Sequence, residues 1–383
     1  MINVRNIGFR EVRKTNLEYL NEAKAEKLHQ HRLLRGDIVF GRKGAVERHA
    51  IIDETTDGWI QGSDCLRLRI NSPDVCIEYL SYYFTTKAHQ DWMQALCSFG
   101  ATMASLNQEI VRRISFPAPK IEMQRKIAAI LSAYDDLIEN NKCRIALLEK
   151  MAEEIYREWF VRLRFPGHEK VKVVKGVPEG WEEKPSNEVL DVLSGGTPKT
   201  DVPGYWDGNI PFFTPKDVGD DFYVLNTEKN VTAKGLSTCN SRLYKKDTIF
   251  ITARGTVGKL ALANRDMAMN QSCYALLPKL SGDVYFYFLA IKTAISYIKG
   301  VSKSGVFDNI VVDTFKIVPI LMPTDELVQR FNLLISPLFQ QTSALLQANE
   351  ILITTRDSLL PRLISGKLSV ENLDIQFPPG MVS

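Results

Sequence analysis

The chain has 383 residues, of which 45% are hydrophobic, 24% are charged and 9% are aromatic, and its formal net charge is +3. This length and composition leave room for two or three globular units, each with its own core. A charged leader with an apolar stretch is missing, as is any apolar run long enough to cross a bilayer, which argues against a secreted or membrane protein. We therefore expect a cytoplasmic protein that does not bind membranes.

The six cysteines lie far apart in the sequence, and no two of them have the C-x-x-C spacing of a zinc site. The same spacing argues against a disulfide framework, as is typical of proteins in a reducing compartment. No metal site is predicted.

Residues 1–118 are rich in β-branched and aromatic residues. Short alternating runs such as DIVFGRKG, broken by glycine, are typical of strands and turns. We expect this segment to form a first globular domain of mixed helix and sheet.

A proline-containing hinge, FPAP, leads into a long helical pattern over residues 119–162. Its apolar positions alternate by four and three residues, as in a coiled-coil seam. The predicted seam consists of Ile127, Leu131, Tyr134, Ile138, Asn141, Ile145, Leu148, Ala152, Ile155 and Trp159. A helix of this length, about 60 Å at 1.5 Å per residue, buries such a stripe only against another helix.

Residues 163–320 contain a second copy of the first segment, since LYKKDTIFITARGTVG at 243–258 is similar to LLRGDIVFGRKGAV at 33–46. The alignment pairs Asp37 with Asp247, Phe40 with Phe250, Val46 with Val257 and Gln61 with Gln271. The copies lie more than two hundred residues apart, which indicates a duplication of half the chain and not a solenoid of short repeats.

Residues 321–383 begin with a second hinge, LMP, and a second long helical pattern. Its predicted seam consists of Leu327, Phe331, Leu334 and Leu338, and then, after a slip, Leu346, Asn349, Ile353, Leu360 and Leu363. Pro337 is expected to kink this helix, and Gly366 is expected to end it. With two-fold pseudosymmetry, the two helices run antiparallel and hold the globular parts apart.

The polar stretch LSGGTPKTDVPGYWDGNIPFFTPKDV, residues 193–218, is a candidate phosphate-binding loop. SGGTPKT lacks the G-x-x-x-x-G-K-[ST] spacing, and Pro198 removes a backbone donor. ARGTVGKL at 253–260 has alanine in place of the first glycine and leucine in place of serine or threonine. No nucleotide site and no catalytic residue are therefore predicted.

These motifs, taken in order, resemble a known family. LSGGTPKTDVPGYWDGNIPFFTPKDV, with RGTVGK and NQSCYAL, is similar to the target-recognition domain of type I DNA restriction–modification specificity subunits. QRKIAAILSAYDDLIENNKCRIALLEKMAEEIYREWFVRLRFPGHE is similar to the central conserved helix of that family, and QRF…LLPRLISGKL is similar to its distal counterpart.

The resemblance implies an α+β fold with two target-recognition domains in a pseudo-two-fold arrangement, separated by two long antiparallel coiled-coil helices. It also implies a non-catalytic, cytoplasmic subunit without cofactors, which reads a split double-stranded DNA target. Two modification subunits, which bind S-adenosylmethionine, and a restriction subunit, a motor nuclease that uses ATP, are the expected protein partners. The alternatives are a specificity-like scaffold of another phage-defence system and a truncated decoy with impaired DNA reading; missing cofactor and metal motifs argue against a self-sufficient methyltransferase or nuclease.

Two sets of candidate site residues follow. The predicted DNA-binding residues are Arg42, Lys43, Gly195, Gly196, Thr197, Lys199, Lys216, Arg254, Gly255, Thr256 and Lys259. Lys and Arg hold phosphates, whereas glycines let the backbone approach a surface closely. Two alternatives stay open: the charges are exposed without a role, and the Gly195–Pro198 turn only closes the core.

The second set is the helix-register pair, Asn141 and Asn349, which occupy matching places in the two helical patterns. A polar residue at a seam position fixes the alignment of two helices at a cost in stability. The alternative is that both amides face solvent or a partner subunit.

One departure from the repeat is large. Ile2 aligns with Phe213, so the first copy has no counterpart of residues 180–212. We interpret this as a misassigned start or a natural truncation of about thirty residues. The first domain is then expected to be less stable, with impaired reading of its half-site.

Overall fold

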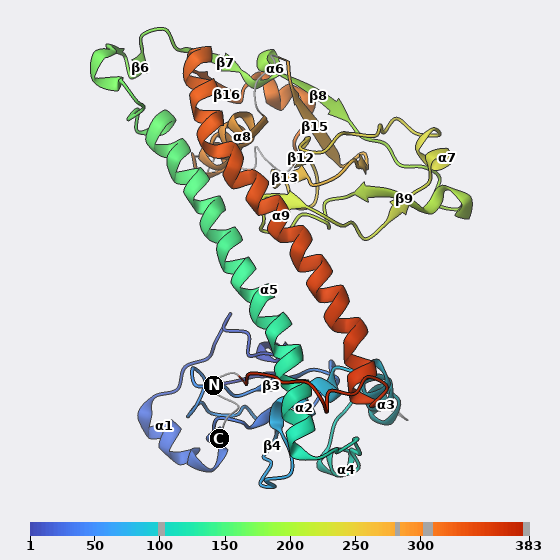
Figure 1. The fold of residues 1–383 in the computed structure, drawn as a ribbon. Coiled ribbons are helices and arrows are strands. Elements are labelled where there is room, and N and C mark those ends of the chain that lie inside the picture. The colour runs from blue at the N-terminus through green and yellow to red at the C-terminus, as the bar shows by residue number, and fades with distance from the viewer. Residues whose placement is uncertain (99–103, 280–283, 302–308, 378–383) are drawn as a thin grey trace. The chain divides into compact units, whose positions relative to one another are not determined.

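The computed structural model describes residues 1–98, 104–279, 284–301 and 309–377. The chain divides into two compact units, of which the first comprises Met1–Ile138 and Ile351–Ser383, and the second comprises Glu139–Glu350. Two long helices, α5 (Ile121–Tyr156) and α9 (Asp325–Ile364), contribute to both units (Figure 1). The units therefore cut across the predicted division into 1–118, 119–162, 163–320 and 321–383, because each contains part of both helices.

The first unit contains one sheet in the order β1-β3-β2-β4. β2 pairs antiparallel with both β3 and β4, and β1 pairs parallel with β3. The strands are β1 (Phe9–Arg10), β2 (Ile38–Gly41), β3 (His49–Ile51) and β4 (Cys65–Leu68), and the helices besides α5 and α9 are α1 (Glu22–Lys27), α2 (Ile77–Phe84), α3 (Lys87–Ser98) and α4 (Gln108–Arg112).

The two faces of this sheet carry separate cores. Phe40 packs with Leu80 and Phe84 of α2 on one face. Val39, the residue before it, packs with Ile7 in the cluster on the opposite face. This alternation follows from the two-residue period of a strand.

The second unit has a five-stranded sheet in the order β10-β13-β12-β15-β8 and a three-stranded sheet in the order β11-β9-β14. The strands of the larger sheet are β8 (Leu190–Ser194), β10 (Tyr223–Val224), β12 (Ile249–Thr252), β13 (Leu260–Ala263) and β15 (Cys273–Pro278). The smaller sheet contains β9 (Trp206–Phe213), β11 (Asn230–Val231) and β14 (Ala268–Met269). The unit also contains two two-stranded antiparallel sheets, β5 (Val173–Val174) with β6 (Val177–Pro178) and β7 (Glu182–Pro185) with β16 (Pro319–Met322). Its other α-helices are α6 (Ser186–Val189), α7 (Ala233–Leu236) and α8 (Val284–Val301).

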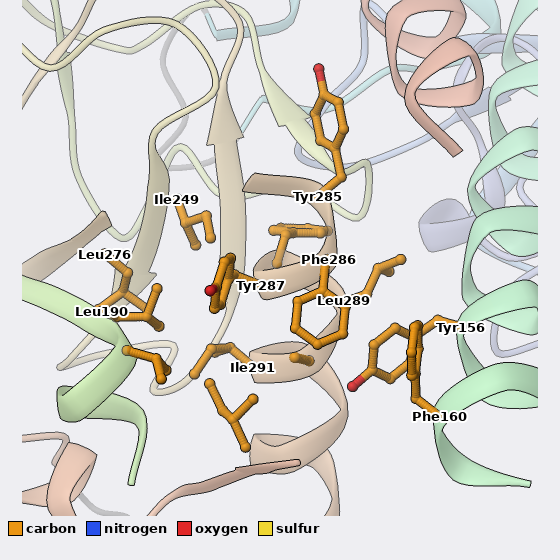
Figure 2. Close-up of a cluster of buried hydrophobic side chains, with 14 of the residues drawn as sticks. Tyr156, Phe160, Leu190, Ile249, Leu276, Tyr285, Phe286, Tyr287, Leu289 and Ile291 are labelled. Carbon is orange, nitrogen blue, oxygen red and sulfur yellow. The ribbon is translucent and has the colours of Figure 1, made fainter. Parts of the chain in front are cut away.

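The core of the second unit lies between the five-stranded sheet, α8 and the end of α5. Figure 2 shows Phe286 of α8 beside Tyr156 and Phe160, which come from the end of α5 and the π-helical turn after it. Ile249 and Leu276 of the sheet belong to the same cluster. Burial of large aromatic side chains in this cluster stabilises the unit and fixes the sheet against α5.

The duplication predicted from the sequence recurs in the strand pairings. β10, β13, β12 and β15 repeat the order and directions of β1, β3, β2 and β4. Gly62 N–H donates to Ile2 O at 2.8 Å, as Asn270 N–H donates to Phe213 O at 2.9 Å, so the alignment of Ile2 with Phe213 is confirmed. β8 belongs to the segment 180–212, and the sheet of the first unit correspondingly has no strand beyond β4 among the described residues.

The backbone hydrogen bonds correct the repeat alignment by one residue at β2. Gly36 N–H donates to Ile52 O at 2.8 Å, and Asp247 N–H donates to Ala263 O at 2.8 Å. Gly36 and Asp247 also share a left-handed backbone, with φ of +87° and +66°. Gly36, and not Asp37, therefore lies opposite Asp247.

The same shift places Val39, and not Phe40, opposite Phe250. Phe40 packs with the α2 side chains, whereas Phe250 packs with Phe213 in a cluster without residues of α8. A one-residue slip moves a strand side chain to the other face of its sheet. The pairing of Phe40 with Phe250 is wrong because it matches residue type across opposite faces.

The pairing of Gln61 with Gln271 is also wrong. The turn before β4 has a hydrogen bond from Cys65 N–H to Gly62 O at 3.1 Å, and the turn before β15 has one from Cys273 N–H to Asn270 O at 3.3 Å. Gly62 therefore lies opposite Asn270, so one glutamine precedes this position and the other follows it.

The predicted seam of the first helix agrees with the structure, since each of its ten positions is buried or half-buried; nine lie in α5, and Trp159 lies in the π-helical turn that follows it. In α9 the prediction is wrong at Leu334 and Ile353, which are 48% and 39% exposed. Near Leu334, the residues that face the core are Ile335 and Phe339, both of which are buried. The apolar sequence around Leu334 allows either choice, and packing decides it.

α9 continues through Pro337 and ends at Ile364. Gly366 follows in the left-handed conformation with φ of +73°, and its N–H donates to Leu363 O at 3.2 Å. This geometry satisfies a terminal carbonyl and matches the predicted helix stop.

None of the helices among the described residues is both long enough and apolar enough to span a membrane. The mixture of helices and largely antiparallel sheets is α+β, as predicted.

Candidate nucleic-acid interface

Four loops of the second unit meet at one edge of its sheets, and we call residues 194–199, 214–220, 253–259 and 270–272 the loop cluster. Ala253 N–H donates to Ser272 O at 2.8 Å, which joins the loop after β12 to the loop before β15. Thr256 Oγ1 donates to Pro215 O at 3.2 Å, which joins the same loop to the one after β9. The structure therefore brings together candidate residues as distant in the sequence as Gly195 and Lys259.

Arg254, Gly255 and Thr256 form the exposed tip of the loop between β12 and β13. Gly255 has φ of +78°, a conformation that glycine adopts without strain. The turn closes with a hydrogen bond from Gly258 N–H to Thr252 O at 2.8 Å. The guanidinium of Arg254 is thus displayed on a well-defined turn.

Two lysines of the cluster, Lys216 and Lys259, are exposed and form surface ion pairs. Lys259 lies 3.6 Å from Asp220, and Lys216 lies 3.7 Å from Glu228. Exposed pairs of this kind contribute little to stability. The ammonium groups are therefore available to exchange these carboxylates for phosphates.

Lys199 is exposed, and its backbone carbonyl accepts a hydrogen bond from Trp206 Nε1 at 3.1 Å. Trp206 packs edge-on against Phe212 with the ring centroids 5.4 Å apart, and Lys229 lies over its ring at 5.5 Å. These contacts give Trp206 and Phe212 a packing role in the smaller sheet. They also fix the position from which Lys199 projects.

Gly195 and Gly196 are buried against the protein itself. A Cβ on Gly195 would lie 2.1 Å from Asn270 O, and a Cβ on Gly196 would lie 2.7 Å from Asn240 N. Both glycines are therefore required for close approach of two backbone segments, as in the alternative interpretation of this turn as core closure. A direct role for them at a DNA surface stays a prediction.

Gln271 is a residue of the loop cluster that the sequence-based site omitted. Thr197 Oγ1 donates a hydrogen bond to Gln271 Oε1, and Gln271 is exposed. Glutamine amides recognise the edge of adenine in the major groove through paired hydrogen bonds. The sequence signal for Gln271 was its place in NQSCYAL, one of the stretches that resemble the target-recognition domain.

The first unit has a matching turn. Lys43 and Gly44 correspond to Arg254 and Gly255, and Gly44 has φ of +79°. Arg42 and Lys43 are exposed, and Gly44 N–H donates to Ala104 O at 3.1 Å. One exposed basic tip per unit is therefore a feature of the duplicated fold.

The predicted register pair lies within the second unit. Asn141 Nδ2 donates to Asn349 Oδ1 at 2.9 Å, and the two residues are 9% and 7% exposed. The structure thus brings the two amides together, and the alternative in which both face solvent does not hold. Their role in fixing helix register stays a prediction.

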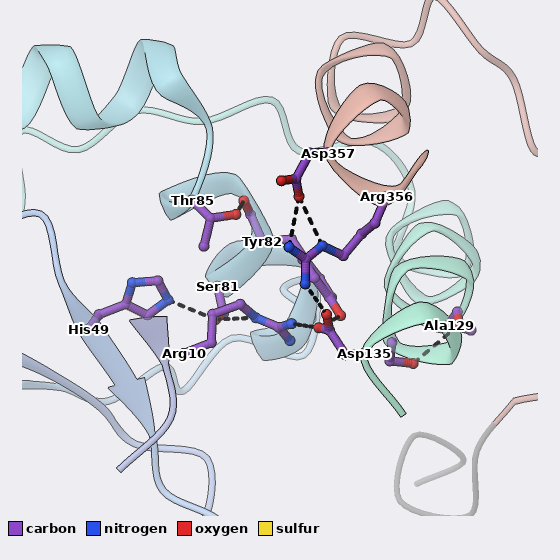
Figure 3. A network of polar contacts seen from close by, with 10 residues as sticks. Arg10, His49, Ser81, Tyr82, Thr85, Ala129, Asp135, Arg356 and Asp357 are labelled. Atoms are coloured by element: carbon purple, nitrogen blue, oxygen red, sulfur yellow. Dashed lines mark hydrogen bonds and ion pairs between the residues drawn. The ribbon is translucent and has the colours of Figure 1, made fainter. Parts of the chain in front are cut away.

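A charged network in the first unit was missed by sequence reasoning. Figure 3 shows Asp135 of α5 between Arg10 of β1 and Arg356 of α9. Its carboxylate also accepts a hydrogen bond from Tyr82 Oη at 2.5 Å, and the Arg10 guanidinium lies over the Tyr82 ring at 3.3 Å. Arg10 donates further to Ser81 Oγ at 3.1 Å. This network ties the sheet of the first unit to its parts of both helices.

The chain belongs to the family described as the type I restriction modification DNA specificity domain, which matches residues 5–150 and residues 178–354. The MjaIX type I restriction enzyme specificity subunit of Methanocaldococcus jannaschii is 28% identical over 307 residues, covering 78% of this chain and 71% of that protein. The HindI type I restriction enzyme specificity subunit of Haemophilus influenzae is 21% identical over 399 residues, covering 87% of each chain.

The fold also matches a solved structure. The S subunit of a type I restriction–modification system from M. genitalium has a TM-score of 0.58 and 18% sequence identity, over 95% of this chain and 91% of that chain. At this identity the likeness shows a shared fold.

Proposed function

We propose that this chain is the specificity subunit of a type I restriction–modification complex and selects the DNA sequence on which the complex acts. The observation that carries the proposal is the duplicated sheet with an exposed basic tip in each copy, in a chain that matches the DNA specificity family twice. Each unit reads one half of a split target. Two readers on one chain recognise two short sequences at a fixed separation.

The loop cluster supplies both kinds of contact that DNA reading requires. Exposed lysine and arginine side chains hold phosphates and set the register of the protein on the duplex. The amide of Gln271 is of the kind that distinguishes bases by their edges. In the first unit, Arg42 and Lys43 take the phosphate-binding part.

The paired helices set the spacing between the half-sites. In the second unit, the Asn141–Asn349 hydrogen bond lies at the seam, where a slip of one helix along the other separates the amides. Leaving a buried amide without a partner costs about 1–3 kcal/mol. The pair therefore favours one alignment of the helices, and with it one spacer length.

The chain itself supplies recognition and assembly, and no catalysis. Two modification subunits contribute S-adenosylmethionine and the methyl-transfer site, and a restriction subunit contributes the ATP-driven motor and the nuclease. The four-part division into recognition domain 1–118, helix 119–162, recognition domain 163–320 and helix with tail 321–383 describes this functional organisation. Support comes from the family match and from the specificity-subunit names of the relatives.

Mapping of methylated sites in cells that carry this gene with its modification partner tests the proposal. The expected result is one bipartite sequence with a constant spacer. Methylation of a single half-site would assign the reading to one unit only, and no sequence-specific methylation would support a decoy. The purified chain, incubated alone with DNA and S-adenosylmethionine, is expected to transfer no methyl group, and any transfer would overturn the scaffold role.

A further inference from the structure

Within the part of the chain that the structure describes, no strand covers the outer edge of β4 in the first unit, whereas β8 covers the corresponding edge in the second unit. In the second unit β15 pairs antiparallel with β8, from Tyr274 opposite Ser194 to Pro278 opposite Leu190. β4 corresponds to β15, but no strand among the described residues pairs with its outer edge. The duplication thus provides an internal template for what the β4 edge accepts.

The backbone of β4 presents the hydrogen-bonding groups that this template uses. Arg42 N–H donates to Asp64 O at 2.8 Å, so alternate residues of the strand, including Leu66 and Leu68, turn their backbone groups toward β2. Arg67 and Arg69 therefore point theirs outward. Their counterparts in β15, Ala275 and Leu277, are the residues opposite Leu193 and Asp191 of β8.

The side chains next to this edge are apolar and incompletely covered. Leu68 is half-buried. Its counterpart Leu276, which lies beside Val192 of β8 in the same sheet, is 0% exposed. Ile70, the next residue on the same face, is also half-buried. A strand with apolar residues at alternate positions would complete the burial of this strip and so remove apolar surface from water.

The positive charge of Arg69 at this edge indicates which residue an added strand would carry opposite it. Arg69 pairs with the buried Asp37 through two hydrogen bonds of 2.7 and 2.6 Å and stays 36% exposed. The template strand carries Asp191 opposite the counterpart of Arg69. An acidic residue directly opposite an arginine on a neighbouring strand is a favourable cross-strand pair.

We propose that the β4 edge is a strand-acceptor site for an extended, antiparallel segment of a partner polypeptide with the β8 pattern. This segment has apolar residues at alternate positions and an acidic residue opposite Arg69. Main-chain hydrogen bonds to Arg67 and Arg69 supply the pairing, and the strip at Leu68 and Ile70 supplies the selectivity. The site is independent of the proposed DNA reading.

The test uses the full chain and a fluorescent peptide of residues 187–197, NEVLDVLSGGT. The peptide is expected to bind in an anisotropy titration and to slow amide exchange across residues 65–70 at least tenfold. A peptide with L193P lacks one pairing N–H and is expected to bind about tenfold more weakly, because one hydrogen bond and the strand geometry are lost.

Two variants of the chain isolate the backbone contribution. Arg67→Pro removes the outward N–H, and Arg67→Ala keeps it, while both lose the side-chain hydrogen bonds to the carbonyls of Gln30 and Arg32. The proline variant is expected to bind the peptide about tenfold more weakly than the alanine variant.

The proposal is overturned if the wild-type chain binds both peptides equally, or if protection falls on residues 273–278, where the peptide would replace β8. It is also overturned if the chain self-associates through β4 in sedimentation experiments and the peptide does not compete. If Arg67→Pro fails to fold, the proposal is still tested by comparing how tightly the wild-type chain binds the peptide 187–197 and its L193P variant.

Discussion

The two units build the same four-stranded topology and attach it to the helices with different chemistry. In the first unit the contact is ionic, since Asp135 of α5 holds Arg10 of β1 and Arg356 of α9. In the second unit Phe222, which precedes β10, stacks on Phe339 of α9 at 5.3 Å. The fold thus fixes where a sheet meets the helix pair and leaves the residues at the contact free to diverge.

A carboxylate of α5 at this contact in the second unit is held differently. Glu149 of α5 accepts a hydrogen bond from Phe222 N–H at 2.6 Å. The pKa of Glu149 is raised to about 7, mainly by burial; the Phe222 N–H and Lys292 act against this rise, and the nearby Asp221 and Glu153 add to it. This carboxylate therefore titrates in the physiological range.

The first unit contains buried histidines, whose pKa values are lowered and not raised. His49 is fully buried, its Nε2 lies 2.8 Å from Ser81 Oγ, and burial, with the charges of Arg10 and His89, lowers its pKa to about 3. Burial also lowers the pKa of His89 to about 4. The two units are therefore expected to respond to pH in opposite directions.

The largest expected effect is acid opening of the first unit. His49 must stay neutral in the folded state, whereas it binds a proton in the unfolded state below pH 6.5, so stability falls as the pH falls toward 3. From pH 7 to pH 4 the loss from His49 alone is about 3 kcal/mol. Hydrogen exchange followed by mass spectrometry is expected to accelerate across residues 1–98 before residues 165–279. His49→Leu should flatten this pH dependence, and an unchanged slope would assign it to other groups.

The next effect is the removal of the ionic contact. Asp135→Ala leaves Arg10 and Arg356 partly buried without their shared carboxylate, which costs about 2 to 3 kcal/mol. Faster exchange is expected across residues 1–98 with no change in residues 165–279. Asp357→Ala, which removes only an exposed partner of Arg356, is the matched control and should cost less than about 1 kcal/mol. Equal effects of the two substitutions would contradict the central role of Asp135.

A third prediction concerns Glu149 in alkaline solution. Because its folded pKa exceeds the unfolded value, the folded state holds the proton more tightly, and stability falls as the pH rises from 4.5 through about 7. Glu149→Gln keeps an acceptor for Phe222 N–H and removes the charge. It should stabilise the second unit by about 2 kcal/mol more at pH 8 than at pH 5. Thermal unfolding at the two pH values measures this difference, and a constant gain would refute the titration.

A smaller effect is expected at the asparagine pair. Asn349→Leu removes the acceptor of the Asn141 amide and should destabilise the second unit by about 1 kcal/mol, whereas the double change to leucine should be neutral or stabilising. The double variant should also lose the constant spacer in methylation mapping. If it methylates the same target with the same spacer, the pair has no register role.

The smallest effect compares the basic tips of the two units. Replacing Arg254 and Lys259 with alanine should lower the slope of log affinity against log salt by about 0.9 for each phosphate that the protein no longer neutralises. Replacing Arg42 and Lys43 with alanine measures the same quantity for the first unit. Lys316→Ala, outside the loop cluster, is the control. An unchanged slope in a folded variant would remove that tip from the DNA surface.

The sequence predicts several features from periodicity and repeat position, and most of these agree with the structure, although the α9 seam is wrong at Leu334 and Ile353. The seam of α5 and the contact between Asn141 and Asn349 follow from positions every three or four residues. The glycine turn at Gly255 follows from its place between two strand patterns. Local patterns of this kind are fixed by backbone geometry before any tertiary contact forms.

Contacts between distant residues that do not occupy matching places in the two copies could not be predicted. Arg10 and Asp135 lie 125 positions apart, and Asp135 and Arg356 lie 221 apart, so no local pattern indicates their contact. The repeat register was wrong at β2 because two diverged copies match equally well one residue apart. The backbone hydrogen bonds of Gly36 and Asp247 distinguish the two alignments.

The discontinuity of the first unit constrains the order in which the chain folds. Ile127 and Leu131 pack with Leu363 and Val370, which leave the ribosome only after the whole second unit has been made. The second unit is continuous in sequence and is free to fold during synthesis, since domains generally fold as units as they emerge. The apolar side chains of α2 and of the start of α5, although encoded early, are thus fully covered only after the end of α9 has been made.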